Sequence, residues 1–248
     1  MQTITPGSGP ELSIVIPCLN ERNNIEPLVQ QISAQRGRGG PSFEVIFVDG
    51  GSKDGTVAEI LSHAGKFGGD LVLLEKGQGP GGYGIDIRRG LTEARGNAVA
   101  WTHADLQCEL ADVFRAYECL RTAETGKLVV KGSRRGRPLF DRSFTFGMQI
   151  LNFVMTGKHI PDINGQPKLF PRELLDELPL GAAPADFSFD LFVLNTAVAK
   201  GYGILEVPVE MKARLHGEAK GGGSTLASKL RLSRQAASYI VSAKRRKP

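Results

Sequence analysis

The chain is poor in cysteine and aromatic residues and lacks long hydrophobic runs. Three cysteines, one tryptophan and 7% aromatic residues occur among its 248 residues. Cys18, Cys108 and Cys119 are far apart and odd in number, so they predict neither a disulfide framework nor a zinc site and are typical of a reducing compartment. The best apolar stretches, 71–74 and 191–199, fall far short of the roughly 20 residues that a bilayer-spanning helix needs.

The remaining composition is ordinary for a soluble globular protein. Apolar residues make up 41% of the chain and charged residues 23%, and the length suits a single domain with a substantial core. Residues 1–10 lack the charged-then-apolar pattern of a secretory signal. We therefore expect a cytoplasmic protein, with peripheral attachment to a membrane surface left open.

Charge is distributed unevenly along the chain. Residues 212–248 carry ten Lys/Arg and one acidic residue, so this tail has a net charge of +9 within a total of +5, and the preceding residues sum to about −4. A basic tail suits nucleic acid, anionic lipid or a bound phosphate, or it is simply a solvated terminus. Aromatic residues do not alternate with these basic ones, which argues against a nucleic-acid partner.

Strand-like and helix-like segments alternate over the first hundred residues. This alternation predicts βαβ units, and hence an α/β fold with a mostly parallel sheet flanked by helices. The expected strands are 12–16, 43–48, 71–75, 98–102, 127–133 and 204–209, with a loop running into a strand over 162–170. The expected helices are 20–35, 56–64, 85–94, 144–156, 187–200 and 224–246. We expect one domain over 1–223, with a donor-binding half (11–108) and an acceptor-binding half (109–223), followed by a basic helix and tail (224–248).

Three polar segments follow expected strands, where ligands bind in a parallel sheet. Asp49 ends a strand and is either a turn former or an acceptor for nucleoside hydrogen bonds, whereas Asp54 is expected to cap the next helix. The third segment begins at Arg214 and runs through a glycine-rich loop to Lys220. Binding of a nucleoside diphosphate requires an acidic residue that accepts hydrogen bonds from the nucleoside, a cation site on the diphosphate, and positive charge from a basic loop.

The second segment, 103–107, is the candidate cation site. If it is extended, Asp105 and Gln107 project from one face, and their oxygens suit Mg²⁺ or Mn²⁺. His103 would lie on the same face. It is either a metal ligand, which favours Mn²⁺ slightly over Mg²⁺, or a hydrogen-bonding residue of the pocket.

Other polar segments are less specific. The run 77–84 is rich in glycine but fits neither a P-loop nor a dinucleotide fingerprint, so we expect a flexible loop near the ligand. Arg88 and Arg89 either approach that ligand or face water. The basic group Arg134, Arg135 and Arg137 supplies further cations for a departing phosphate.

These motifs resemble those of the family-2 inverting glycosyltransferases with the GT-A fold. Residues 14–21 resemble the opening strand with P-x-x-N-E, and residues 48–56 resemble V-D-D-x-S-x-D-G-T. Residues 104–107 resemble the metal motif D-A-D-L-Q, and residues 214–220 resemble R-x-x-G-E-S-K. Together with 187–190 and 201–209, they are similar to the branch of dolichol-phosphate mannose synthases and polyprenyl-phosphate glycosyltransferases.

The resemblance implies a role for each matched residue. Pro17, Glu21 and Asp49 would hold the nucleoside, and Asp105 with Gln107 the divalent ion on the diphosphate. Basic residues would bind the donor or acceptor phosphate: Arg214 and Lys220. A lipid phosphate acceptor is already ionised, whereas a hydroxyl acceptor would need a general base. The candidates for that base are Asp162 and Asp190.

Three departures from the family pattern bear on specificity. Gly50 replaces the second Asp of V-D-D, and His103 replaces the first Asp of the metal motif. Residues 162–168 replace the usual D-x-x-S/C-G-F-R/K, in a region that faces the acceptor in the family. The sugar and the acceptor therefore need not be mannose and dolichol phosphate.

We expect a metal-dependent inverting hexosyltransferase that uses a GDP- or UDP-sugar and a polyprenyl or dolichyl phosphate. The expected terminal helix, 224–246, is basic and amphipathic and would either lie on an anionic membrane or a membrane-anchored partner, or pack on the core. Two alternatives remain open: transfer to a soluble glycan or metabolite hydroxyl, and a non-catalytic nucleotide-sugar-binding subunit.

Overall fold

A computed structural model of the chain describes residues 9–67, 69–136, 146–147, 149–150, 152–154, 157, 159–214, 216, 231–232 and 234–240. Its centre is a seven-stranded sheet with the strand order β3-β2-β1-β4-β6-β5-β7. The strands are β1 (Leu12–Cys18), β2 (Phe43–Asp49), β3 (Leu71–Leu74), β4 (Ala98–Trp101), β5 (Leu128–Arg135), β6 (Lys168–Pro171) and β7 (Gly203–Glu210).

The sheet is mostly parallel, as expected. β1 pairs in parallel with both β2 and β4, β2 with β3, and β5 with β7. Only β6 among these strands runs antiparallel, between β4 and β5. The carboxyl ends of the other six strands therefore open onto one edge of the sheet, which is where a parallel α/β sheet binds its ligands.

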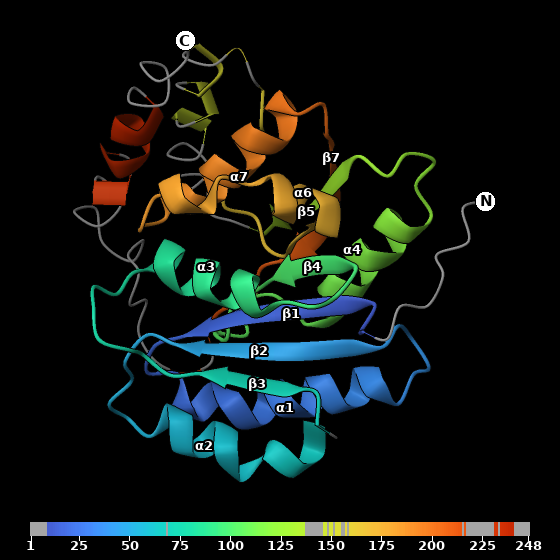
Figure 1. The fold of residues 1–248 in the computed structure, drawn as a ribbon, viewed down its shortest axis with the longest axis vertical. Coiled ribbons are helices and arrows are strands. Elements are labelled where there is room, and N and C mark those ends of the chain that lie inside the picture. The colour runs from blue at the N-terminus through green and yellow to red at the C-terminus, as the bar shows by residue number, and fades with distance from the viewer. Residues whose placement is uncertain are drawn as a thin grey trace.

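Helices cover both faces of the sheet. The helices are α1 (Arg22–Arg36), α2 (Thr56–Ser62), α3 (Tyr83–Glu93), α4 (Ala111–Arg121), α6 (Arg172–Glu177) and α7 (Ser188–Ala199), with 3₁₀ turns at Ala64–Phe67 and Leu180–Ala182. Figure 1 shows α1 and α2 below strands β1–β3, with α3 and α7 on the opposite side. Each face has its own apolar core, because successive strand residues point to opposite sides.

The fold adds two helices to those expected from the sequence. Residues 111–121 form α4, whose apolar side contributes Val113, Ala116 and Tyr117 to the core it shares with α1. The short helix α6 continues directly from β6. All three cysteines are free thiols in the structure. Within the described residues, no helix is long and apolar enough to cross a membrane.

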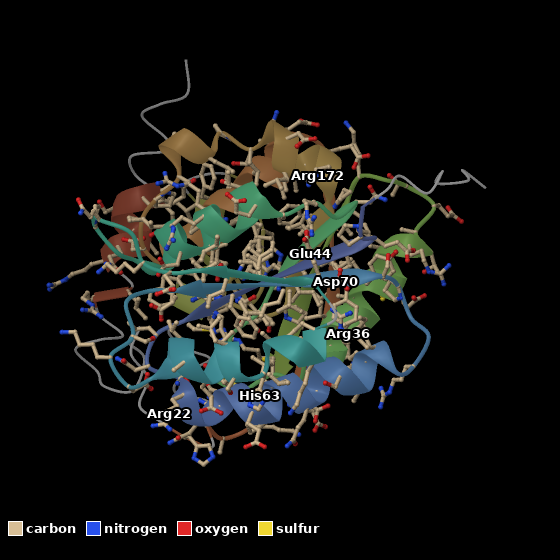
Figure 2. All side chains as sticks on the ribbon, turned by 60° about the horizontal axis from the view of Figure 1, so that its bottom comes forward. Arg22, Arg36, Glu44, His63, Asp70 and Arg172 are labelled. Atoms are coloured by element: carbon tan, nitrogen blue, oxygen red, sulfur yellow. The ribbon has the colours of Figure 1, made fainter. Side chains whose placement is uncertain are left out.

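Charged groups at the amino ends of the strands serve the fold rather than a ligand. Glu44 is fully buried and accepts hydrogen bonds from Ser13 Oγ (2.6 Å) and from the Arg95 backbone and guanidinium (2.6–2.9 Å). Nearby, Arg36 of α1 forms an ion pair with Asp70 (2.9 Å), and Figure 2 shows the two side chains close together. These groups are paired with one another, so the carboxyl edge of the sheet is the better candidate for a ligand site.

Candidate active site

The loops after β1 and β2 are joined by hydrogen bonds at the carboxyl edge. Ser52 Oγ accepts from the Asn20 backbone (2.8 Å), and Asn20 Oδ1 accepts from the Lys53 backbone (2.8 Å). Thr56 Oγ1 accepts from the Glu21 backbone at 2.9 Å. Pro17 lies within β1, opposite Val48 of β2. The two loops therefore form one rigid rim beside the strand ends.

Asp49 and Asp54 both organise the loop after β2. The buried Asp49 carboxylate accepts hydrogen bonds from the backbone of Gly51 (2.9 Å) and Ser52 (3.1 Å), so it forms the turn. Asp54 Oδ1 accepts from the backbone of Thr56 (3.0 Å), at the start of α2, which agrees with the expected structural role. Nucleoside binding by Asp49 stays a prediction.

Arg214 connects the two acidic segments of the site. Its guanidinium donates to Glu21 Oε1 (3.1 Å) and to Asp105 Oδ2 (2.8 Å). Burial raises the pKa of Glu21, although Asn24 and Arg214 oppose this shift. Burial also acts to raise the pKa of Asp105, but hydrogen bonding and charge from His103, with help from Gln107 and Arg214, outweigh it and leave that pKa lowered.

The 103–107 segment is a turn and not the extended segment that would place Asp105 and Gln107 on one face. Leu106 has a φ of +58°, and the Gln107 backbone donates to Asp105 Oδ1 at 3.1 Å. The Gln107 side chain lies near the carbonyl of Lys212 (3.4 Å), and the Lys212 backbone donates to the Gln107 carbonyl (2.9 Å). The turn thus keeps Asp105 and Gln107 close and ties them to the segment that carries Arg214.

His103 belongs to a buried polar network behind Asp105. Its Nε2 lies 3.1 Å from the Tyr83 hydroxyl, which also donates to Asp190 Oδ1 (3.2 Å). Asp190 forms an ion pair with Lys168 (2.9 Å), and both side chains are inaccessible to solvent. Burial lowers the pKa of Lys168 to about 8, although Asp190 opposes this shift. His103 therefore makes a hydrogen-bond contact through Nε2, while its Nδ1 lies 3.9 Å from Asp105 Oδ2, so metal ligation by His103 stays a prediction.

Asp162 and Arg134 are paired with each other. The Arg134 backbone donates to Asp162 Oδ2 (2.8 Å), and its guanidinium contacts both carboxylate oxygens at 2.5–3.1 Å. Burial acts to raise the pKa of Asp162, but Arg134 outweighs it and the pKa is lowered. Both candidate bases, Asp162 and Asp190, are therefore held by cations.

The donor atoms near Asp105 fit a single divalent cation that completes its coordination with ligand oxygens. No three His, Cys, Asp or Glu side chains of the described residues converge as a metal site. Asp105 contributes a buried carboxylate and His103 an imidazole nitrogen 3.9 Å from it, whereas the role of the Gln107 amide oxygen stays a prediction. A carboxylate with an imidazole is a donor set that a divalent cation can use, and the choice between Mn²⁺ and Mg²⁺ stays a prediction.

The remaining basic candidates divide into structural, exposed and undescribed groups. Arg88 and Arg89 donate to the carbonyls of Leu180 (3.3 Å) and Glu75 (2.5 Å), so they support the fold around α3. Arg135 is exposed at the end of β5. Lys220 and Arg137 lie outside the described residues, and their roles stay predictions.

Sequence reasoning missed several residues that the fold brings to this region. Tyr83, Lys168 and Gln166 line the network around Asp190, although Tyr83 is far in the chain from the other two. Their only sequence signal was position: Tyr83 follows the glycine-rich run, and the other two lie in the divergent 162–168 segment. Asp86, in the first turn of α3, gave no signal at all.

The match to a protein-family model decides the classification. Residues 13–178 match the model described as "Glycosyl transferase family 2", which is more than half of the chain. The chain belongs to glycosyl transferase family 2. This confirms the family that the motifs resemble.

Curated relatives of this family-2 chain act on polyprenyl phosphates according to their names. Dodecaprenyl-phosphate galacturonate synthase of Rhizobium johnstonii is 28% identical over 221 residues, covering 89% of this chain and 64% of the relative. Human dolichyl-phosphate beta-glucosyltransferase is 27% identical over 218 residues, covering 80% of this chain and 66% of the relative. The chain thus spans slightly less than two thirds of the length of these relatives.

Solved structures confirm the fold. Glucosyl-3-phosphoglycerate synthase from Mycobacterium tuberculosis, crystallised with Mn²⁺, UDP and glucosyl-3-phosphoglycerate, superimposes with a TM-score of 0.70 at 21% identity. The match covers 96% of this chain and 80% of that one. The family-2 chain therefore has the α/β architecture of that enzyme over nearly its whole length.

Proposed function

We propose that this chain transfers a sugar, with inversion, from a nucleoside diphosphate to a polyprenyl phosphate. The observation that carries the proposal is the contact of Arg214 with Asp105 and Glu21, which brings an acidic cation site and a cationic side chain together at the carboxyl edge. Two curated relatives named for polyprenyl-phosphate acceptors support the choice of acceptor.

The charges at the edge suit a diphosphate leaving group. In the reaction, an acceptor oxygen attacks the anomeric carbon while the bond from that carbon to the diphosphate breaks, and the diphosphate leaves with the electron pair. A bound divalent cation would neutralise part of the charge that develops on it. Arg214 would turn from the two carboxylates to a phosphate oxygen, since electrostatic stabilisation of developing charge is the main task in such a transfer.

The pairing of the candidate bases favours an acceptor that is already ionised. Asp162 is engaged by Arg134 and Asp190 by Lys168, so accepting a proton would require each to give up an ion pair. A hydroxyl acceptor needs such a base, whereas a phosphate oxygen does not. The two ion pairs therefore favour a polyprenyl phosphate acceptor over a soluble glycan or metabolite hydroxyl.

A row of exposed apolar side chains fits a lipid acceptor. Residues 146–147, 149–150 and 152–154 are helical, and four large apolar residues there are 48–69% exposed: Phe146, Ile150, Phe153 and Val154. Their i, i+4, i+7 and i+8 spacing puts them on one side of a helix, which we call the apolar stripe. Asn152, which is buried, bonds to Asn195 of α7 (2.9 Å) and so anchors the other side.

The terminal helix contributes less to this proposal than expected from the sequence. In its described part, 231–232 and 234–240, Ile240 and Ala236 are buried. The ring centroids of Tyr239 and Phe192 are 6.5 Å apart. This part packs on the core. We therefore assign contact with a lipid surface to the apolar stripe.

Donor and acceptor are tested in two steps. Thermal shifts with GDP, UDP and their sugars, with and without Mn²⁺ or Mg²⁺, should select one nucleotide, because a ligand at 100 times its Kd adds about 2.7 kcal/mol of stability. The selected donor is then incubated with undecaprenyl phosphate in vesicles, and product is measured. Product from a soluble hydroxyl acceptor alone would favour the alternative acceptor, and absence of any nucleotide shift would favour a non-catalytic subunit.

Serine at two stripe positions should separate lipid contact from chemistry. For the variant F146S/F153S, we expect turnover with undecaprenyl phosphate in vesicles to fall about tenfold or more. The reason is that the apolar contact of two phenyl rings with the lipid is lost. Nucleotide binding should be unchanged. Leu61→Ser is the matched control, since Leu61 is equally exposed (53%) but lies on α2. Wild-type turnover of F146S/F153S would contradict the role of the stripe.

A further inference from the structure

The position after Asp49 holds glycine, and the space beside it is filled by an acid from elsewhere in the chain. A Cβ added to Gly50 would lie 3.0 Å from Asp86 Oδ2 and 3.4 Å from the carbonyl of Cys18. Gly50 is not among the glycines with positive φ, so its backbone does not require glycine. What occupies the space of a side chain at position 50 is the carboxylate of Asp86.

Asp86 has few partners within the described residues. It lies in the first turn of α3, its side chain is 13% exposed, and its carboxylate accepts no hydrogen bond from the residues described. Its nearest cation is Arg89 Nη1, at 3.9 Å. Burial raises its pKa to about 6 and Asp49 adds to this, whereas Arg89 and Lys76 lower it. Ionised Asp86 therefore destabilises the ligand-free fold. The favourable interaction of its charge with the N-terminal end of the α3 dipole does not offset this destabilisation.

We propose that Asp86 binds the donor nucleoside in place of the Asp that Gly50 replaces. The family pattern V-D-D ends β2 with two acids, and this chain retains only the first, Asp49. Asp86 supplies the second carboxylate from α3, at the same corner of the carboxyl edge. The inference rests on the proposed function, because it assigns a contact within the same donor site.

The Asp86 carboxylate accepts no hydrogen bond from the described residues, and its ion pair with Arg89 is long, at 3.9 Å. Its two oxygens can therefore accept hydrogen bonds from a pair of adjacent donors, and a nucleoside offers such a pair either on the ribose hydroxyls or on the N1–H and N2–H₂ groups of guanine. Uracil offers a single N–H between two carbonyls. Loss of affinity for both GDP and UDP on removal of Asp86 would assign it to the ribose, and loss confined to GDP would assign it to the base.

Asp86→Asn is the first test, with Glu93→Gln as its control. Glu93 is exposed at the end of the same helix, and its substitution removes the same charge. Calorimetric titration of the full chain with GDP or UDP and Mn²⁺ should show D86N binding 10- to 100-fold more weakly, as expected for a lost charge-assisted hydrogen bond. E93Q should bind like wild type. Wild-type affinity of D86N would overturn the inference.

Thermal stability distinguishes a binding role from a structural one. Because the pKa of Asp86 is raised in the folded state, ionisation destabilises the fold above about pH 6, and this cost disappears below about pH 4. D86N should therefore unfold at the same or a higher Tm than wild type at pH 7.5, with no gain near pH 4. A clear loss of Tm at pH 7.5 would mark Asp86 as a structural residue and contradict the inference.

Moving the carboxylate back to β2 is the sharper test. Gly50→Asp alone should weaken nucleotide binding, because its side chain would meet the Asp86 carboxylate. Asp86→Ala alone should weaken it through loss of the contact. The double variant G50D/D86A should bind at least tenfold more tightly than D86A. A double variant as weak as D86A would refute the replacement.

The two proposals fail in different ways. If wild type binds no nucleotide under any condition, the proposed function fails, and the inference fails with it. If wild type binds and turns over while D86N matches it, only the inference on Asp86 is wrong.

Discussion

Asp105→Asn is expected to reduce sugar transfer about 10³-fold while leaving the fold intact. The substitution keeps the size of the side chain but removes the only carboxylate of the 103–107 turn, to which Arg214 donates at 2.8 Å. The proposed cation site and one of the two carboxylate partners of Arg214 are lost, and losing one preorganised electrostatic group at a reacting phosphate costs several kcal/mol of transition-state stabilisation. Initial rates with saturating donor and acceptor measure the effect.

Glu109→Gln is the matched control for this prediction. Glu109 lies four residues beyond Asp105, is exposed, and pairs with Lys212 on the surface. The substitution removes the same charge near the site without touching its inner groups, so we expect less than a twofold change in rate. Turnover by D105N within tenfold of wild type would contradict the assignment of Asp105.

Lys168→Met is expected to destabilise the fold by about 3–5 kcal/mol, the usual cost of breaking a buried ion pair. Lys168 and Asp190 are both inaccessible to solvent and 2.9 Å apart, and Lys168 also donates to the carbonyl of Gly165 (3.1 Å). Methionine fills a similar volume but leaves Asp190 with an uncompensated charge in the core. Urea unfolding monitored by circular dichroism measures the change.

A surface pair provides the comparison for Lys168. Lys200 pairs with Glu177 at the same 2.9 Å, but the side chains are 36% and 40% exposed. Lys200→Met should therefore change stability by no more than about 1 kcal/mol. The double variant K168M/D190L should regain part of the loss, because it removes both buried charges. Equal effects of K168M and K200M would show that burial does not decide the strength of the pair.

The strand ends were predictable because two simple rules combine there. Apolar β-prone runs predicted β1, β2 and β4, and polar residues directly after them predicted that Asp49 and Asp105 share an edge of the sheet. The helix 111–121 was not predicted because its polar residues obscure the apolar face that packs on β5 and β6. The extended form of 103–107 was wrong because the backbone turns at Leu106, where alternation along the sequence does not apply.

Contacts between distant segments could not be read from the sequence. Arg214 meets Asp105 across 109 residues and Glu21 across 193 residues, and Lys168 meets Asp190 only because β6 enters the sheet antiparallel. The apolar stripe was readable as a spacing, but its exposure was not, because the same pattern suits a buried helix. Sequence periodicity reports which face is apolar and does not report what covers that face.

The family, the α/β class and the strand ends that carry the acidic groups follow from local patterns of a few residues. The fold is needed to show which cation neutralises which acid and that Asp162 and Asp190 are both held in ion pairs. It also placed Asp86 in the space beside Gly50. Electrostatic pairing depends on distances and burial set by the packing of strands far apart in the chain, and only the folded chain specifies those.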